Sequence, residues 1–210
     1  MKFNTTQLSV SKKLTEQIKN LLSEGNKECA IFSANCHQSI EEMVMLYEEL
    51  QPRKFDSFVE LGVCYGGSLL IYSTLLCLPR ASIIGIDIKI TDGMRYVKNK
   101  LQLEGKNVTF YIENTLTAHK HLQNNSIDLL HIDAQHDNTV YRDWELYYPK
   151  VKKDGIILLH DVCLHKGCQS IMNDLITSGA SYKIIKSSTT ALGIGIIYND
   201  KSINLKKNEH

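Results

Sequence analysis

Acidic and imidazole side chains end two apolar runs in the second half of the chain. The run IDLLHID ends at Asp133, with His136 three residues later, and the run GIILLHD ends in His160 and Asp161. Both runs are short and uniformly apolar, which is typical of buried parallel strands. We therefore expect Asp133 and Asp161 to end adjacent central strands and to face one crevice, where they can hold one divalent cation.

Such a cation would act as a Lewis acid that lowers the pKa of a substrate hydroxyl and orients it for reaction. We predict Asp133, His160 and Asp161 as metal ligands, and the imidazole favours Mn, Fe or Zn more than Mg does. His136 or His160 would be the general base, because imidazole accepts a proton near neutral pH. The alternative is that both histidines are ordinary polar residues hydrogen-bonded to backbone at strand ends.

A second metal-ligating set overlaps the first. His160, Cys163, His165 and Cys168 lie close together in the sequence and could form a zinc site. Two further cysteines at the usual short spacing are missing. Free thiols are therefore the expected state of the six cysteines.

The stretch FVELGVCYGGS carries an apolar run into a glycine turn. A dinucleotide fingerprint needs three glycines, and the residues at those positions are Gly62, Cys64 and Gly67. The middle glycine, which lets the backbone approach a pyrophosphate, is absent. Glu60 would also repel a phosphate, whereas it suits a cationic ligand. The turn is therefore expected to bind a ligand without phosphate.

Polar residues also end the next two runs. Asp87 ends the second run, twenty residues beyond Gly67, where a carboxylate can accept hydrogen bonds from both hydroxyls of a ribose. Asn114 and Thr115 end the third run, and either could flank an adenine or simply cap the following helix.

Apolar runs alternate with helical patterns from residue 57 onward, which predicts a parallel, doubly wound α/β sheet with right-handed crossovers. Ligands bind such sheets at the carboxyl ends of the strands. The predicted strands are SFVEL, SIIGIDI, VTFYI, IDLLHID and GIILLHD. The predicted helices between them and after the last lie at about 67–78, 93–104, 115–122, 138–150 and 167–178.

The end of the chain departs from this alternation. YKIIK and GIGIIY are separated only by SSTTAL, which is too short for the crossover that parallel neighbours require. The two runs are therefore predicted to form an antiparallel pair.

Two amphipathic helices are predicted before the first strand, at 11–24 with Gly25 as the stop and at 39–50. Ser39 and Glu42 have the spacing of a capping box. We expect residues 1–52 to form a helical cover rather than an independent domain. Residues 53–200 would form the ligand-binding domain and 201–210 a polar tail.

Composition sets limits on partners and location. The chain has 210 residues, enough for one well-buried domain, with 24 basic against 23 acidic side chains. This balance gives no electrostatic reason to expect nucleic acid or an anionic membrane as a partner. The N-terminus lacks an apolar signal region, and no stretch is long and apolar enough to span a membrane. We expect a cytoplasmic protein.

Residues 127–162 resemble a known family. The Ile132-Asp133 pair followed by His136, and the later His160-Asp161 pair, resemble class I S-adenosylmethionine-dependent methyltransferases related to the catechol and caffeoyl-CoA O-methyltransferases. The resemblance is greater to a small bacterial group typified by macrocin and cephamycin tailoring enzymes. It extends over roughly residues 39–200.

The resemblance implies a Rossmann-like sheet of order 3-2-1-4-5-7-6 and S-adenosylmethionine as cofactor. The expected activity is O-methylation of a small hydroxylated molecule, such as a natural product, a sugar or a catechol, assisted by a divalent metal. Catechol-type enzymes present Asp-Asn where this chain has His160-Asp161. The predicted cofactor-binding residues are Glu60, Gly62, Tyr65, Gly66, Gly67, Ser68, Asp87, Ile88, Asn114, Thr115 and Asp133.

Substrate choice is expected to depend on His37, Gln38, His165 and Lys166, and self-association could use the N-terminal helices. Two other functions are open. One is a non-catalytic module that binds S-adenosylmethionine or a partner. The other is an NAD-linked oxidoreductase, against which the missing glycine and the terminal hairpin count.

Overall fold

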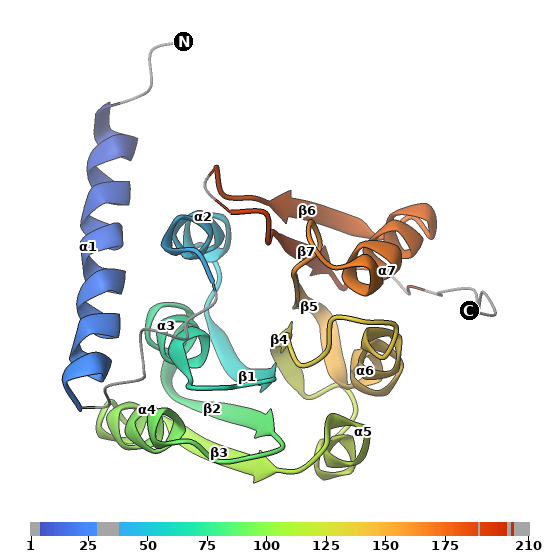
Figure 1. Cartoon of the computed structure of the whole chain (residues 1–210), viewed down its shortest axis with the longest axis horizontal. Helices are drawn as coiled ribbons and strands as arrows, with labels where there is room; N and C mark the ends of the chain where they lie inside the picture. Colours follow the sequence, from blue (N-terminus) through green and yellow to red (C-terminus); the bar gives the residue numbers. More distant parts are fainter. Residues whose placement is uncertain (1–4, 29–37, 189, 201–202, 204–210) are drawn as a thin grey trace.

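The computed structural model describes residues 5–28, 38–188, 190–200 and 203. Seven strands form one sheet in the order β3-β2-β1-β4-β5-β7-β6 (Figure 1). The strands are β1 (Phe55–Leu61), β2 (Cys77–Asp87), β3 (Asn107–Ile112), β4 (Ile127–Ile132), β5 (Val151–His160), β6 (Ser181–Ile185) and β7 (Ile194–Tyr198). The first five pair in parallel, whereas β7 is antiparallel to both β5 and β6. The predicted doubly wound sheet and terminal hairpin are confirmed.

Helices cover both faces of the sheet. They are α1 (Thr5–Glu28), α2 (Ile40–Leu50), α3 (Gly67–Leu76), α4 (Asp92–Leu103), α5 (Thr115–Ala118), α6 (Val140–Tyr147) and α7 (Lys166–Thr177), with 3-10 turns at His119–His121 and Tyr148–Lys150. Figure 1 shows α1 to α4 on one side and α5 to α7 on the other. Each face buries its own apolar cluster, so the sheet is sandwiched between two helical layers.

Helix α1 is longer than predicted. It begins at Thr5 and continues through Gly25 to Glu28, so the expected stop at Gly25 is wrong. A glycine inside a helix costs only about 1 kcal/mol relative to alanine. Burial of Leu14, Ile18 and Leu22 in the apolar cluster that α1 shares with α2, α3 and α4 outweighs that cost.

Helix α2 begins where predicted, but the capping box does not form. Ser39 makes no side-chain cap bond. Glu42 is fully buried instead, and its Oε1 accepts hydrogen bonds from the backbone N–H groups of Ser187 and Gly193 and from the hydroxyl of Thr190. The carboxylate thus ties α2 to the loop between β6 and β7.

Strand β2 begins earlier than predicted. Helix α3 ends at Leu76, and Cys77 opens β2 opposite Phe55, so Cys77 does not lie on a helix. The register is irregular before Ser82 pairs with Ser57, and Pro79 falls in this irregular stretch. Proline lacks the N–H of a regular ladder, so a bulge accommodates it.

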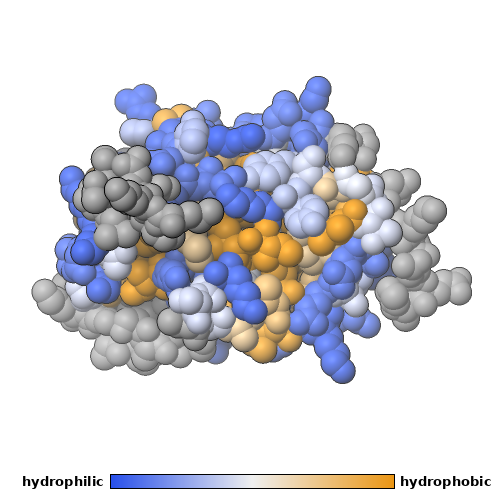
Figure 2. Space-filling model, turned by 90° about the horizontal axis from the view of Figure 1, so that it is seen from above, coloured by the Kyte–Doolittle hydropathy of each residue, from blue (hydrophilic) through white to orange (hydrophobic). Residues whose placement is uncertain are grey.

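The surface and the termini add three facts. Within the described ranges, no helix is long and apolar enough to cross a membrane. Figure 2 shows an apolar band between hydrophilic margins on the face seen from above.

Residue 203 alone is described from the predicted tail, and Ile203 is buried there. The domain division and self-association stay predictions.

We predict that Glu42→Ala lowers the free energy of unfolding by about 2 to 4 kcal/mol, because two buried backbone N–H groups lose their acceptor. Urea unfolding followed by circular dichroism would measure this change. Glu145→Ala, which removes an exposed ion pair with Arg142, should cost less than about 1 kcal/mol. Equal effects of the two substitutions would show that the buried carboxylate does not hold the loop.

Candidate active site

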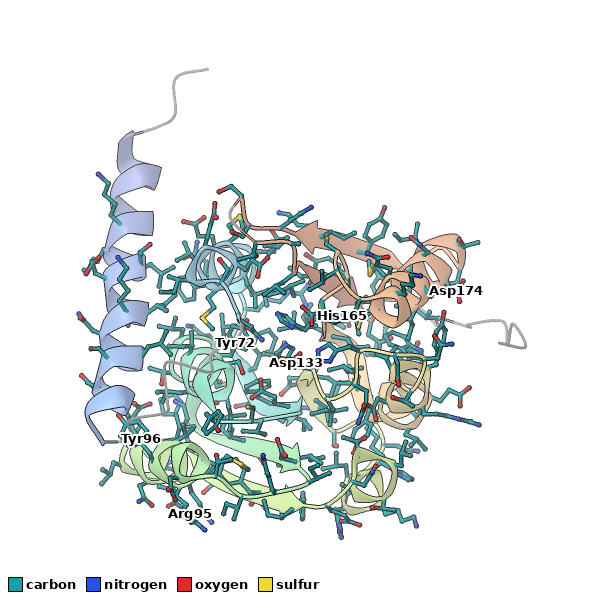
Figure 3. The ribbon with its side chains drawn as sticks, viewed as in Figure 1. Tyr72, Arg95, Tyr96, Asp133, His165 and Asp174 are labelled. Carbon is teal, nitrogen blue, oxygen red and sulfur yellow. The ribbon has the colours of Figure 1, made fainter. Side chains whose placement is uncertain are left out.

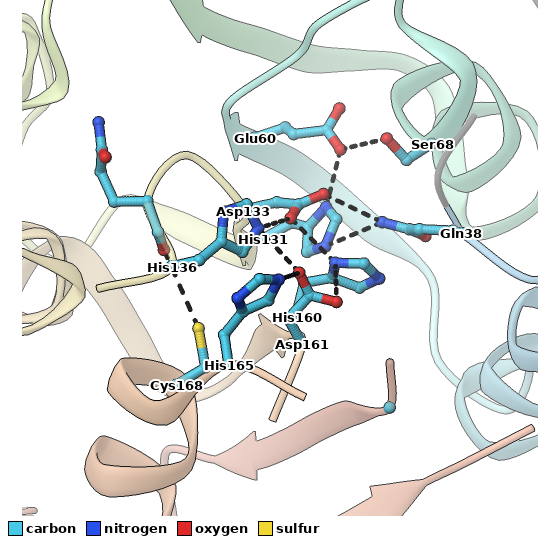
Figure 4. A network of polar contacts seen from close by, with 12 residues as sticks. Gln38, Glu60, Ser68, His131, Asp133, His136, His160, Asp161, His165 and Cys168 are labelled. Atoms are coloured by element: carbon cyan, nitrogen blue, oxygen red, sulfur yellow. Dashed lines mark hydrogen bonds and ion pairs between the residues drawn. The ribbon is translucent and has the colours of Figure 1, made fainter. Parts of the chain in front are cut away.

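The sequence-predicted residues Asp133, His136, His160 and Asp161 meet at the carboxyl ends of β4 and β5. Their ligand atoms all lie within 4.8 Å of one another. Nε2 of His136 lies 2.9 Å from Asp161 Oδ2 and 3.4 Å from Asp133 Oδ1, and Nδ1 of His160 lies 3.0 Å from Asp133 Oδ1. Figure 4 shows these four side chains converging. We call them the Asp/His cluster.

Local backbone geometry sets the position of Asp161. Its φ of 60° lies in the left-handed region, which turns the chain sharply after β5. The Asp161 carbonyl accepts hydrogen bonds from the N–H groups of Leu164 and His165. The turn brings Nε2 of His165 to 3.5 Å from Asp161 Oδ2 and its ring to 4.8 Å from that of His136. His165 is therefore a third imidazole at the edge of the cluster.

The donor set fits a divalent cation. Both ring nitrogens of His160 and Oδ1 of Asp161 are buried and make no hydrogen bond. Nδ1 of His160 nevertheless lies 3.0 Å from Oδ1 of Asp133 and 3.4 Å from Oδ1 of Asp161. Buried polar atoms without partners are rare in folded proteins. Two carboxylates and two imidazoles are ligands that Mn, Fe or Zn accept. A cation would supply a partner for one ring nitrogen of His160 and for Oδ1 of Asp161.

Mutual charge stabilises the cluster without a cation as well. Burial alone would raise the pKa of Asp133, but the charge of His160 and the contact with His136 hold it well below its usual range. The hydrogen bonds of His136 to Asp133 and Asp161 raise the pKa of the imidazole to about 10. Burial lowers the pKa of His160, but the Asp133 charge outweighs it and the net shift is upward.

The alternative zinc set is not assembled in the part of the chain that the structure describes. The one His/Cys/Asp/Glu group with metal-binding spacing there is the Asp/His cluster, which contains no cysteine. Cys168 is buried, with its sulfur 4.0 Å from the carbonyl oxygen of Gln135, and burial raises its pKa to about 12. Cys168 and Cys163 are free thiols, as predicted.

A second polar group lies beside the cluster. Glu60 is fully buried, and its Oε1 lies 2.7 Å from Nδ1 of His131 and accepts a 2.6 Å hydrogen bond from Ser68. Burial raises the pKa of Glu60, while the bonds from His131 and Ser68 oppose that shift. Sequence reasoning missed His131. A histidine between Leu130 and Ile132, at an interior position of the strand IDLLHID, was the signal that could have revealed it.

The glycine turn links β1 to the loop after β4. Gly62 has a φ of 83°, and a Cβ atom there would lie 2.5 Å from the carbonyl oxygen of Asp133 and 2.6 Å from Cα of Ala134. Only glycine fits such a position. The close approach places the turn directly against the loop that carries Asp133 and His136.

A pocket lies against this loop. Its lining residues are Gly62, Ile86, Asp87, Ile88, Glu113, Asn114, Thr115, Ala134 and Gln135. Asp87 accepts hydrogen bonds from the N–H groups of Cys64 at 2.8 Å and Lys89 at 3.2 Å, and a carboxylate has lone pairs left for a ligand. Asn114 caps α5 through Leu116 N–H and also lines the pocket, so both of its predicted roles are compatible.

The structure thus separates the predicted cofactor residues. Gly62, Asp87, Ile88, Asn114 and Thr115 line the pocket. Glu60 and Ser68 lie in the buried polar group, Asp133 lies in the Asp/His cluster, and Tyr65, Gly66 and Gly67 form the turn into α3. Figure 3 places Asp133 in the middle of the molecule, between Tyr72 of α3 and His165. His37 lies outside the described residues.

Comparisons with known proteins concern the family and the fold. A family described as "Methyltransferase domain" matches residues 59–162, the segment from β1 to the turn after β5. No curated protein matches the chain.

Several solved structures share the fold at low sequence identity. The O-methyltransferase TomG from Streptomyces achromogenes, involved in tomaymycin synthesis and solved with S-adenosylmethionine, has 13% identity and a TM-score of 0.67, covering 85% of this chain and 88% of that one. A methyltransferase from Geobacter sulfurreducens has 12% identity and a TM-score of 0.64, with coverages of 88% and 90%. An rRNA methylase from Streptococcus thermophilus has 9% identity and a TM-score of 0.57, with coverages of 75% and 95%.

We predict that Mn²⁺ raises the unfolding free energy of the protein, by about 2.7 kcal/mol when the ion is at a hundredfold excess over its dissociation constant. Thermal unfolding with and without the ion measures this shift. Asp161→Asn should abolish it while leaving the backbone unstrained, since asparagine tolerates the left-handed conformation at this position. A Mn²⁺ shift that survives in Asp161→Asn would place the ion elsewhere.

Proposed function

We propose that the chain is a class I S-adenosylmethionine-dependent methyltransferase that methylates a hydroxyl group of a small molecule with the help of a divalent cation. The observation that carries this proposal is the shared loop after β4. Asp133 and His136 on this loop belong to the Asp/His cluster, while Ala134 and Gln135 line the pocket. A cofactor in the pocket and an acceptor at the cluster would therefore be neighbours.

The pocket suits the adenosine part of S-adenosylmethionine. Asp87 would accept hydrogen bonds from the ribose hydroxyls, and Asn114 and Thr115 would flank the adenine. Ile88 lines the pocket and is 73% exposed. An adenine ring stacked on it would remove this apolar surface from water. Glu60, with its buried Oε2 lacking a partner, favours a cationic methionyl group nearby.

Asp133, His160 and Asp161 would hold the cation. When bound, a divalent ion would lower the pKa of the acceptor hydroxyl and fix its direction. The side chain of His160 is only 3% exposed, which favours a ligand role over the role of base. The carboxylates of Asp133 and Asp161 each offer an oxygen atom within the Asp/His cluster. Methyl transfer gains mainly from a fixed position of the acceptor relative to the methyl group.

His136 is the better placed of the two predicted bases. Its side chain is 38% exposed, so an acceptor can reach it, and Asp161 is positioned to stabilise the imidazolium that forms. This role requires that the charges of Asp133 and Asp161 be neutralised, because in their present arrangement they raise the pKa of His136 to about 10. His165 lies on the open side, where the acceptor would enter.

A small acceptor is favoured over nucleic acid by charge. The chain carries 24 basic and 23 acidic side chains, whereas binding to phosphate backbones relies on an excess of basic groups. The choice among a natural product, a sugar and a catechol is left to acceptor screening. A cytoplasmic location stays a prediction.

We predict that S-adenosylmethionine and S-adenosylhomocysteine bind in titration calorimetry, whereas NAD does not. Asp87→Ala should weaken both adenosyl ligands by roughly tenfold or more, because the carboxylate that accepts from the ribose is removed. Tighter binding of NAD than of S-adenosylmethionine would instead support an oxidoreductase.

We predict that His136→Ala lowers kcat by roughly 10² to 10⁴ with an accepted hydroxyl substrate, because proton removal loses its base. The dissociation constant of S-adenosylmethionine should stay within about twofold of wild type, since His136 does not line the pocket. A kcat within a few-fold of wild type would assign the base elsewhere. Binding of the cofactor without turnover of any acceptor would favour the non-catalytic module.

A further inference from the structure

A row of buried polar side chains connects β1 and α3 to the Asp/His cluster. Glu60 and His131 are fully buried, Tyr72 is 1% exposed and Gln38 7%. They come from four separate parts of the chain, and Gln38 precedes α2. Figure 4 shows Gln38 reaching toward both His131 and Asp133. Burial of so many polar groups is costly unless each is hydrogen-bonded, so their arrangement is tightly constrained.

The bond between Glu60 and His131 determines which imidazole nitrogen carries the proton. Oε1 of Glu60 already accepts a hydrogen bond from Ser68 at 2.6 Å, and an accepting oxygen matches a donor at Nδ1 of His131 across 2.7 Å. Nε2 of a neutral imidazole is then an acceptor. The ring is also held edge-on by Tyr72, at 5.6 Å between ring centroids.

The acceptor at Nε2 in turn fixes the amide of Gln38. The amide nitrogen lies 3.3 Å from His131 Nε2 and 3.4 Å from Asp133 Oδ2, and its two hydrogens serve these two acceptors. The amide oxygen accepts a hydrogen bond from the hydroxyl of Tyr72. A flipped amide would set its oxygen against the carboxylate of Asp133 and against Nε2. One orientation therefore satisfies all three neighbours.

We propose that Gln38 is a positioning residue for Asp133. By donating to Oδ2, the amide of Gln38 holds the carboxylate so that Oδ1 faces His160 at 3.0 Å and His136 at 3.4 Å. Glu60, His131 and Tyr72 act through Gln38 by fixing its orientation. A ligand carboxylate with one oxygen held by an outer partner keeps its direction, and loss of such partners typically weakens metal binding ten- to a hundredfold.

Gln38 thus has a role other than the one predicted from the sequence. There it was expected to help select the substrate. The residue would act on the geometry of the cation site and would not need to touch the acceptor. Gln38, which precedes α2, would thus support the cation site from outside the Asp/His cluster. This inference rests on the proposed cation-assisted transfer for its metal-binding test.

Calorimetric titration of Mn²⁺ into three variants tests the proposal. Gln38→Met keeps the size of the side chain but removes both donors, and it should weaken Mn²⁺ binding by roughly tenfold or more. Tyr72→Phe removes the hydroxyl that orients the amide and should give a smaller loss. Gln102→Met, the same exchange at an exposed position of α4, should bind Mn²⁺ like wild type. Affinity for S-adenosylhomocysteine should stay within about twofold throughout. Wild-type Mn²⁺ affinity in Gln38→Met would overturn the proposal.

Nuclear magnetic resonance separates this proposal from the proposed function. If the wild-type protein binds no Mn²⁺, cation assistance fails, and the side-chain amide of Gln38 still reports on positioning. Its hydrogens should exchange with water much more slowly than those of Gln102, and Tyr72→Phe should speed that exchange. Long-range ¹H–¹⁵N spectra should show His131 protonated at Nδ1. Equally fast exchange at Gln38 and Gln102 would refute a fixed amide.

Discussion

Desolvation of charged groups at the carboxyl ends of β1, β4 and β5 is the constraint on which the rest of the site depends. Glu60, His131, His160 and Asp161 are buried, and Asp133 is nearly so. An isolated buried charge would cost several kcal/mol, so each carboxylate here lies beside an imidazole or a hydroxyl. The pairing holds the pKa of Asp133 well below its usual range, and an ionised carboxylate is what a cation requires.

Backbone geometry brings the two halves of the site together. Gly62 lets the turn after β1 lie against Asp133 and Ala134, where any Cβ would clash. The left-handed conformation of Asp161 reverses the chain so that His165 returns over the carboxylate. The pocket and the Asp/His cluster consequently share one short loop, so the proposed cofactor and acceptor would be neighbours there.

The sequence could predict what local patterns encode. Apolar runs and the short SSTTAL connection predicted the sheet and its antiparallel end, and the polar ends of the runs predicted Asp133, His160 and Asp161 as neighbours. Pairings across long sequence distances could not be predicted. Glu60 and His131 are 71 positions apart, and Gln38 and Asp133 are 95 apart, so only the folded sheet reveals them. Tertiary packing also outweighed two local signals, which are the helix stop expected at Gly25 and the capping box expected at Ser39.

The central claim is that the Asp/His cluster holds a divalent cation next to the methyl group of S-adenosylmethionine. Electron–nuclear double resonance on the Mn²⁺-loaded protein, with the cofactor labelled by ¹³C at its methyl group, tests both parts at once. The account predicts a coupling from Mn²⁺ to one imidazole nitrogen that is lost in His160→Ala, together with a dipolar coupling to the labelled methyl carbon. A spectrum of Mn²⁺ surrounded only by water, with neither coupling, would contradict it.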